Sequence, residues 1–295
     1  MVFESLAGEL RYGLRSDGVP VYVCSAKELF PSTAEGGEYP FKSFSESYVK
    51  AAMAAQVDWR SDGGGKAVTP AKDQGGNPYC GTFSRVECAE GQYGLRSGYP
   101  KRNFSVEQLV DCYGWDLDQN GAFFETGFES WEDYPYNMTA PSGDPGKGPP
   151  PCAFDRQKVI AASVFSNHTT IPGSVGADQL AAFIHHNGPV GGGIDSGIFY
   201  LAHGSGPDTF VNASACKSRA GAGIDHAIVA VGYGTDAKLG NYWLIKNSWG
   251  AGFGDQGFIK IARGVDCGRF ESTGAGVYTY GDPATYYETA AEIIV

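Results

Sequence analysis

The segment DHAIVAVGYGTDAKLGNYWLIKNSWG, residues 225–250, decides the fold of this chain. It contains two apolar runs, HAIVAVGYG (226–234) and NYWLIKNS (241–248), which a short polar connection joins. This arrangement predicts an antiparallel β-hairpin. Pairing about the centre of the connection puts His226 roughly opposite Asn247. An imidazole that faces a carboxamide is a base with an orienting partner, because the amide oxygen can accept from one ring nitrogen and leave the other for a nucleophile.

The hairpin lies in a strand-rich half that follows a helical half. VGGGID (190–195) and GFIKIARG (257–264) are short apolar runs between glycine-rich turns, and we expect them to be strands. Upstream, residues 82–97 have the apolar spacing of a helix. Residues 105–112 predict a second helix, which Ser105 would cap, with Gln108 three residues later as in a capping box. Residues 44–55 predict a further short helix, which Ser45 or Ser47 would cap. Helices followed by strands indicate an α+β protein with two subdomains.

A candidate nucleophile lies in the helical half. Cys80 immediately precedes the helix predicted over 82–97. A thiol at the N-terminus of a helix feels the positive end of the helix dipole, which favours the thiolate. Gln74 lies six residues earlier in a glycine-containing loop, so its amide and the Cys80 backbone N–H could together stabilise an oxyanion.

Five segments carry a family resemblance. They are VDWR (57–60), AVTPAKDQGGNPYCGTFS (67–84), LVDC (109–112), DHAIVAVGYG (225–234) and IKNSWGAGFGDQGFIKI (245–261). In this order they resemble the papain family of cysteine proteases (peptidase clan CA), over roughly residues 57–280. The resemblance implies a two-subdomain fold, with a helical left half (about 66–170), a β-barrel-like right half (about 171–275) and the active-site cleft between them. Residues 281–295 would then form a C-terminal tail.

The resemblance also implies roles for individual residues. Cys80 would be the nucleophile, His226 the general base and then acid, Asn247 the orienting residue and Gln74 the oxyanion donor. Trp249 would shield the His–Asn hydrogen bond from water. The residues that would bind substrate are Gly121, Ala122, Phe123, Gly193, Ile224, Asp225, Trp249 and Ser272.

The family positions also predict the specificity of the enzyme. A wide apolar pocket would hold the substrate residue two before the cleaved bond, and its lining would be Phe123, Gly193, Ile224 and Ser272. This pocket would prefer leucine or an aromatic residue. Glu271 is one residue from the pocket floor and could reverse this preference by admitting arginine.

The cysteines follow the family with one exception. By family position, Cys112 pairs with Cys152 and Cys216 with Cys267, which leaves Cys80 as the catalytic thiol. Of the seven cysteines, Cys24 and Cys88 would then be free. A further family disulfide is missing, because Asn77 and Gln119 stand at its two positions. We expect a hydrogen bond between these two side chains to hold the nucleophile's loop instead.

Two departures keep a second function open. Gly81 stands where the family usually has a tryptophan, and one disulfide is absent. The first hypothesis is a papain-like cysteine endopeptidase; the alternative is a catalytically silent papain-fold binding or structural protein. Residues 1–56 are polar and irregular in sequence and are interpreted as a truncated or unusual propeptide, since the family's inhibitory propeptide ends before VDWR.

Composition limits the partners. A formal net charge of -11 makes nucleic acid an unsuitable partner, and the sequence contains no apolar stretch of about 20 residues that could cross a bilayer. No metal or organic cofactor is implied. The expected partners are protein or peptide substrates, with the chain's own N-terminal segment or a protein inhibitor as further candidates for the cleft. Disulfides and four N-x-[ST] sequons favour a secreted or lysosomal/vacuolar protein, although no signal peptide is visible.

Overall fold

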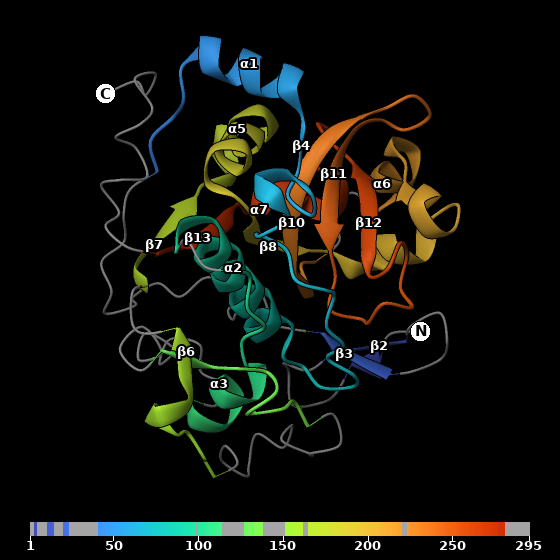
Figure 1. Cartoon of the computed structure of the whole chain (residues 1–295). Helices are drawn as coiled ribbons and strands as arrows, with labels where there is room; N and C mark the ends of the chain where they lie inside the picture. Colours follow the sequence, from blue (N-terminus) through green and yellow to red (C-terminus); the bar gives the residue numbers. More distant parts are fainter. Residues whose placement is uncertain are drawn as a thin grey trace.

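The architecture is that of an α+β protein, as the sequence predicts (Figure 1). The computed structural model describes residues 3–4, 11–14, 20–23, 41–97, 100–113, 127–137, 151–161, 165–219 and 223–280. Within them an eight-stranded sheet runs in the order β7-β13-β8-β10-β11-β12-β9, with β4 paired to β10. Every pairing in it is antiparallel except that of β12 with β9. The sheet is open at both ends of this path, so the β-rich half is not a closed barrel.

One strand of this sheet precedes α2 (Cys80–Arg96) in the sequence, and the other seven lie between residues 165 and 280. In chain order the strands are β4 (Val57–Asp58), β7 (Phe165–Ile171), β8 (Val190–Ile194), β9 (Phe210–Val211), β10 (His226–Asp236), β11 (Gly240–Lys246), β12 (Phe258–Ala262) and β13 (Ala275–Tyr280). A separate two-stranded sheet pairs β5 (Phe128–Glu129) with β6 (Val159–Ala161).

The predicted hairpin is confirmed, with a shift in register. β10 and β11 pair antiparallel, and Val229 lies opposite Lys246. Asn247 therefore stands two residues from the position directly opposite His226. Two features set this register: the turn is centred on Lys238, because Asp236 pairs with Gly240, and an irregularity between Ala230 and Gly232 changes the pairing by one residue. The shift still leaves His226 and Asn247 at the same end of the hairpin.

The described helices pack around the large sheet and around a second, smaller apolar core that lies between α2 and α3. They are α1 (Glu46–Ala55), α2 (Cys80–Arg96), α3 (Val106–Tyr113), α5 (Ala177–Asn187), α6 (Ala213–Ser218) and α7 (Phe270–Thr273). Short 3-10 helices are η2 (Asp62–Gly64), η4 (Arg156–Lys158), η5 (Gly173–Val175), η6 (Ser196–Leu201), η7 (Gly206–Asp208) and η8 (Cys267–Arg269). α2 begins two residues earlier than predicted, so Cys80 is its first residue rather than the residue before it.

Serine caps begin α1 and α3, as expected. Ser45 accepts from the Tyr48 backbone N–H at 3.2 Å, and Ser105 from that of Gln108 at 3.0 Å. The Gln108 side chain does not complete a capping box. It donates to the Gly127 carbonyl at 3.0 Å and accepts from the Glu129 backbone N–H at 2.8 Å. It therefore ties α3 to the β5 segment.

α2 is the central helix of the molecule. In Figure 1 it runs between the large sheet and the part formed by α3 and β6. One apolar core contains α5 and the inner faces of the sheet, and a second lies between α2 and α3. Residues 80–94 of α2 are all buried, because the helix is covered on both sides. This packing fixes Cys80, at its N-terminus, relative to the sheet.

The N-terminal segment contains regular structure that the sequence pattern did not predict. β1 (Phe3–Glu4), β2 (Arg11–Leu14) and β3 (Pro20–Val23) form a three-stranded antiparallel sheet, with Leu14 opposite Pro20. The expectation of an irregular segment is wrong for these ranges. Two four-residue runs with a five-residue connection carry too little alternation to be recognised as a hairpin from sequence.

Residues 41–56 pack into the same core as the strands that follow them. Phe44 is 1% exposed and its ring stacks on that of Tyr48 at 4.9 Å. The Gln179 side chain, from α5, accepts from the Phe44 N–H at 2.8 Å and donates to the Phe44 carbonyl at 2.9 Å. Tyr233, on β10, donates to the Ala52 carbonyl at 2.8 Å. We propose that the unit built around the large sheet includes residues 41–56 and does not begin at residue 57.

If residues 41–56 belong to the folded unit, Gln179→Ala should lower its stability. The change removes two hydrogen bonds to the Phe44 backbone and should cost about 1–2 kcal/mol of unfolding free energy. The melting temperature should fall by roughly 2–8 °C, as measured by calorimetry. Lys50→Ala, on the exposed face of α1, is the control and should leave it nearly unchanged. Equal melting temperatures for the two variants would place the start of the folded unit after α1.

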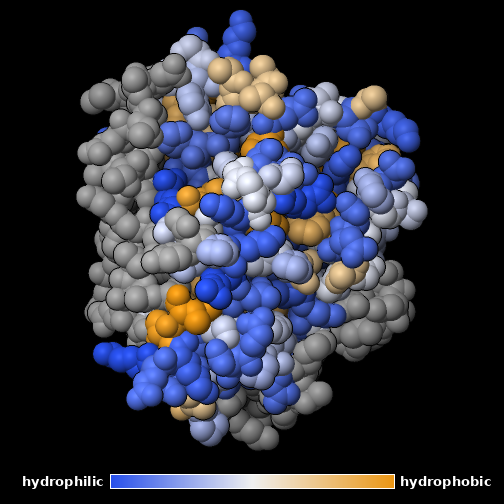
Figure 2. Space-filling model, in the orientation of Figure 1, coloured by the Kyte–Doolittle hydropathy of each residue, from blue (hydrophilic) through white to orange (hydrophobic). Residues whose placement is uncertain are grey.

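The visible surface is polar. Figure 2 shows hydrophilic residues over most of the coloured part of this face, with hydrophobic ones in small separate groups. Among the described residues, Tyr200 is the one large hydrophobic side chain that is exposed. In the same part of the chain, none of the helices has the length and apolar character needed to span a bilayer.

Candidate active site

His226 and Asn247 form a hydrogen bond whose direction the structure fixes. His226 is the first residue of β10, and its Nε2 lies 2.7 Å from Asn247 Oδ1. The same oxygen accepts from the Ser248 backbone N–H at 2.9 Å, which is consistent only with an oxygen at this place. Because a carboxamide oxygen can only accept, the proton must lie on Nε2. Nδ1 is therefore the basic nitrogen, and among the described residues it has no hydrogen-bond partner.

The surroundings keep the imidazole neutral and dry. His226 and Asn247 are both fully buried. Burial lowers the pKa of His226 to about 4, although the hydrogen bond with Asn247 opposes this shift. The Trp249 ring lies 5.0 Å from the His226 ring, and the Phe199 ring lies 6.3 Å from it. These rings lie against the His–Asn pair, where Trp249 was expected.

Cys80 is positioned next to the histidine by α2. One turn after Cys80, the Ser84 hydroxyl donates to the Ile228 carbonyl at 2.9 Å, which joins α2 to β10 two residues after His226. Cys80 itself packs against Ala227 and is fully buried. Cys80 lies one helix turn, about 5.4 Å, before Ser84, and His226 lies two strand residues, about 6.6 Å, before Ile228. Because these two distances are similar, the Ser84–Ile228 bond and the Ala227 contact place Cys80 at the His226 end of β10.

Cys80 is not a thiol in this structure. It is disulfide-bonded, so the expectation of a free catalytic thiol is wrong for the state described. Its partner is none of the other described cysteines, because Cys112 pairs with Cys152, Cys216 pairs with Cys267, and Cys88 is a buried free thiol. The two disulfides predicted from the family are thereby confirmed. Cys24, expected to be free, lies outside the described residues.

Gln74 is joined to Asn247 through Ser248. The Ser248 hydroxyl donates to Gln74 Oε1 at 2.6 Å, and the Gln74 backbone N–H donates to the Ser248 carbonyl at 2.8 Å. Gln74 Nε2 donates to the Asn77 carbonyl at 2.8 Å. An amide nitrogen has two hydrogens, so one remains for another acceptor. Ser248 was not singled out from the sequence, although it stands inside the quoted run NSWG.

The structure places only part of the expected substrate-binding set. Gly193 pairs with Ala227, the neighbour of His226, so it lies beside the site on β8. Asp225 precedes β10, and burial raises the pKa of its carboxyl to about 6, although it accepts from the Ser196 backbone N–H at 2.7 Å. Ile224 is half-buried and Ser272 is exposed on α7. Gly121, Ala122, Phe123 and Gln119 lie outside the described residues.

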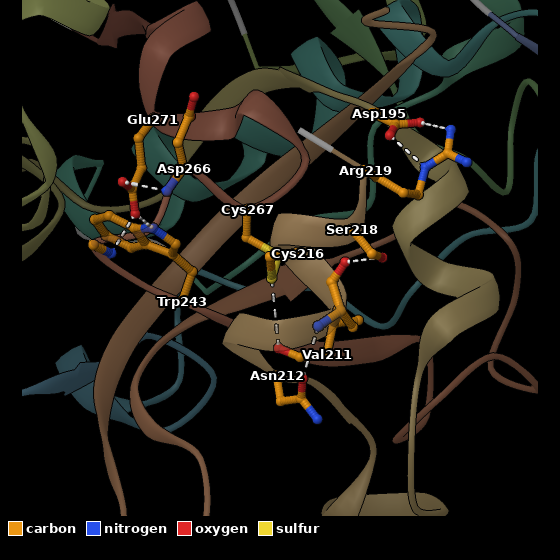
Figure 3. The surroundings of a disulfide bond; sticks show 12 residues. Asp195, Val211, Asn212, Cys216, Ser218, Arg219, Trp243, Asp266, Cys267 and Glu271 are labelled. Atoms are coloured by element: carbon orange, nitrogen blue, oxygen red, sulfur yellow. Dashed lines mark hydrogen bonds and ion pairs between the residues drawn. A yellow bond between two sulfur atoms is a disulfide. The ribbon is translucent and has the colours of Figure 1, made fainter. Parts of the chain in front are cut away.

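The Glu271 carboxylate already accepts three hydrogen bonds within the protein. It accepts from Trp243 Nε1 at 2.9 Å, the Gly264 N–H at 2.6 Å and the Asp266 N–H at 3.0 Å. Figure 3 shows this carboxylate turned towards Trp243 and Asp266. Because these three donors already satisfy the Glu271 carboxylate, we do not expect it to bind an arginine side chain of a substrate.

Comparison with known proteins identifies the family. The papain family cysteine protease model matches residues 53–277. This chain belongs to the papain family of cysteine proteases. It is 34% identical to cysteine proteinase 15A of Pisum sativum, over 73% of this chain and 60% of that protein. It is also 34% identical to digestive cysteine proteinase 2 of Homarus americanus, over 72% of this chain and 62% of that protein.

The solved structures agree with this assignment. Digestive procathepsin L 3 of Tenebrio molitor superposes with a TM-score of 0.64 at 26% identity, over 86% of this chain and 77% of that one. The recombinant stem bromelain precursor superposes with a TM-score of 0.62 at 23% identity, over 83% of this chain and 76% of that one, which supports the fold alone. The chain spans about 60% of the length of the first curated relatives that it matches.

Proposed function

We propose that this chain is a cysteine endopeptidase in which Cys80, His226, Asn247 and Gln74 hydrolyse peptide bonds through an acyl-enzyme. The observation that carries the proposal is the direction of the His226–Asn247 hydrogen bond. It leaves a buried basic nitrogen at the end of β10 that packs beside Cys80. A base with an orienting partner and a sulfur at a helix N-terminus are the parts that this chemistry needs.

Each residue has a separate task in the proposed reaction. Reduced Cys80 gives its proton to His226 Nδ1 and attacks the peptide carbonyl as the thiolate. The oxyanion that forms accepts from the Gln74 amide and from the backbone N–H at the start of α2. His226 then protonates the leaving amine, and afterwards activates the water that hydrolyses the thioester. The expected substrates are proteins or peptides with an apolar residue two before the cleaved bond.

The alternative of a silent binding protein also has support. Cys80 is disulfide-bonded, and all four proposed site residues are fully buried. A site in this state cannot turn over, whatever its geometry. The endopeptidase proposal therefore includes a reduction step, and the two functions differ in whether reduced Cys80 behaves as an activated thiol. We also propose an oxidising compartment, since the described disulfides would not persist among cytosolic reductants.

Alkylation of Cys80 distinguishes the two functions. After reduction, iodoacetamide should label Cys80 at pH 6 about 10- to 100-fold faster in the wild type than in His226→Ala. An unassisted thiol with a pKa near 8.5 is less than about 1% thiolate at that pH. In the reduced chain the Cys80 proton can pass to His226, and the thiolate and imidazolium that result stabilise each other. At pH 9 the difference should shrink to a few-fold. Peptide mapping after each time point measures the rate.

Cys88 is the internal control for this measurement. It is buried, and burial raises the pKa of its thiol far above the usual range, so it should label slowly in both variants. Labelling of Cys80 that is as slow at pH 6 in the wild type as in His226→Ala would favour the silent protein.

A further inference from the structure

One tyrosine holds the loop that leads to Cys80. The Asn77 side-chain amide donates to the Tyr136 hydroxyl at 3.0 Å, and this hydroxyl donates to the Gln74 carbonyl at 3.1 Å. Asn77 stands at one of the two positions where the family has a disulfide, while Gln119, at the other, lies outside the described residues. Tyr136 comes from a different segment, 62 residues after Gln74. It therefore links the loop to the segment that follows β5.

The Tyr136 ring is itself held by α2 and its neighbours. It meets the Phe83 ring edge-on at 4.9 Å and lies 5.9 Å from the Trp131 ring. Phe83 is fully buried and stands three residues after Cys80 on α2. Burial raises the pKa of the Tyr136 hydroxyl well above its usual value, so the group keeps its proton and can donate. The hydroxyl is thus fixed relative to the helix that carries the nucleophile.

The hydroxyl acts on both ends of one turn. The Asn77 N–H approaches the Gln74 carbonyl at 3.3 Å, and Gln74 Nε2 donates to the Asn77 carbonyl at 2.8 Å. Residues 74–77 are therefore closed on themselves, and Tyr136 contacts the carbonyl at one end and the side chain at the other. Without the hydroxyl, the Asn77 amide and one lone pair of the Gln74 carbonyl lose their partner, and the turn is free to shift.

We propose that Tyr136 is a positioning residue, which replaces the missing disulfide and fixes the Gln74 amide where the substrate oxyanion forms. The inference rests on the proposed function of Gln74. Its chemical advantage follows from the state of Cys80. Hydrogen bonds to a tyrosine are unaffected by the reductant that must open the Cys80 disulfide, whereas a disulfide at position 77 would be exposed to it.

Tyr136→Phe tests this role in the full-length, reduced chain. We expect kcat to fall about 10-fold with KM changed less than about 2-fold, since a displaced oxyanion donor weakens transition-state binding and leaves substrate binding intact. In the background of Gln74→Ala the same change should have little further effect, because Tyr136 acts through Gln74. The rate of Cys80 alkylation should stay within about 2-fold.

Tyr134→Phe is the matched control. Its hydroxyl, two residues away, donates to Asp111 at 2.8 Å and accepts from the Ala153 N–H, and neither of these hydrogen bonds involves the turn. This variant should lose stability without losing kcat. A fall in kcat for Tyr136→Phe that is equally large with and without Gln74 would overturn the positioning role, and so would an unchanged kcat.

Hydrogen exchange separates this inference from the function. The backbone amides of residues 75–80 other than Pro78 should exchange about 10-fold faster in Tyr136→Phe than in the wild type or in Tyr134→Phe. Unchanged exchange would overturn the inference even in an active enzyme. Faster exchange in a chain without any Cys80-dependent hydrolysis would support the link between Tyr136 and the turn, but would refute both the proposed function and the role of Tyr136 in it.

Discussion

The reduced chain is expected to hydrolyse peptides at least about 10⁴-fold faster than either the unreduced chain or the reduced Cys80→Ala variant. Cys80 is disulfide-bonded, and a sulfur in a disulfide cannot attack a carbonyl. A thiol reductant such as dithiothreitol attacks this bond as the thiolate, and the S–S bond breaks with one sulfur leaving as a thiolate. A second thiolate of the reductant then closes its own disulfide and releases the remaining sulfur. The net reaction frees Cys80 and its partner as thiols and forms one oxidised dithiothreitol.

The measurement is kcat/KM on a fluorogenic peptide against dithiothreitol concentration. Activity should rise with the fraction of reduced Cys80, which peptide mapping under non-reducing conditions determines. Cys88→Ala should respond to reductant as the wild type does, because this thiol is free and buried on α2. Mapping also shows whether Cys112–Cys152 and Cys216–Cys267 stay closed at the dose that activates.

Two results would contradict this prediction. Full activity before reduction would mean that Cys80 is free in the protein as isolated. Equal activity in Cys80→Ala and the wild type would remove Cys80 from the mechanism, and with it the proposed function.

Lys246→Met is expected to destabilise the fold more than Gln179→Ala does. Lys246 ends β11, and its ammonium lies 2.9 Å from the Glu87 carboxylate and 3.0 Å from the Thr69 hydroxyl. The approach to Glu87 is an ion pair without hydrogen-bond alignment. The side chains of both charged residues are 2% exposed. Burial lowers the pKa of Lys246, although the charge of Glu87 opposes this shift.

A second buried pair lies beside the first. Lys72 Nζ lies 2.7 Å from Glu90 Oε1, and Thr69 donates to the other Glu90 oxygen at 2.6 Å. The two carboxylates belong to α2, while Lys246 directly precedes Asn247. This group of four charges therefore joins α2, whose first residue is Cys80, to β11, which Asn247 directly follows. The two lysines and two glutamates have a net charge of zero, and removal of one lysine alone leaves an excess of negative charge.

Removal of Lys246 leaves a buried carboxylate without its counter-ion. Breaking a buried pair from one side costs about 3–5 kcal/mol, which corresponds to a fall of roughly 10 °C in melting temperature for a domain of this size. Calorimetry measures it. Lys246→Met combined with Glu87→Gln should recover part of the loss, because the unpaired charge is gone.

Lys260→Met is the control for a surface pair. Lys260 lies 3.2 Å from Asp236, and the two side chains are 24% and 30% exposed. Its loss should cost less than about 1 kcal/mol. If Lys246→Met costs no more than Lys260→Met, the buried group does not hold α2 to the sheet.

The sequence was sufficient to indicate the family, because its signals are local. Strand periodicity on both sides of a polar turn placed the β10–β11 hairpin, and the runs around Cys80, His226 and Asn247 occur in the family order. Serine caps at positions 45 and 105 depend on three-residue contacts, so they too were predictable. The disulfides Cys112–Cys152 and Cys216–Cys267 came from the resemblance, not from the residues themselves.

Tertiary structure alone decided what joins these parts. The amide orientation of Asn247 depends on the Ser248 N–H, and the Gln74 turn depends on a tyrosine 62 residues away. The bonded state of Cys80 and the packing of residues 41–56 on α5 and β10 carry no periodic signal either. The physical reason is common to all of them. Hydrogen bonds, disulfides and buried ion pairs between distant segments depend on distances that exist only after the chain has folded, whereas periodicity and capping depend on neighbours along the chain.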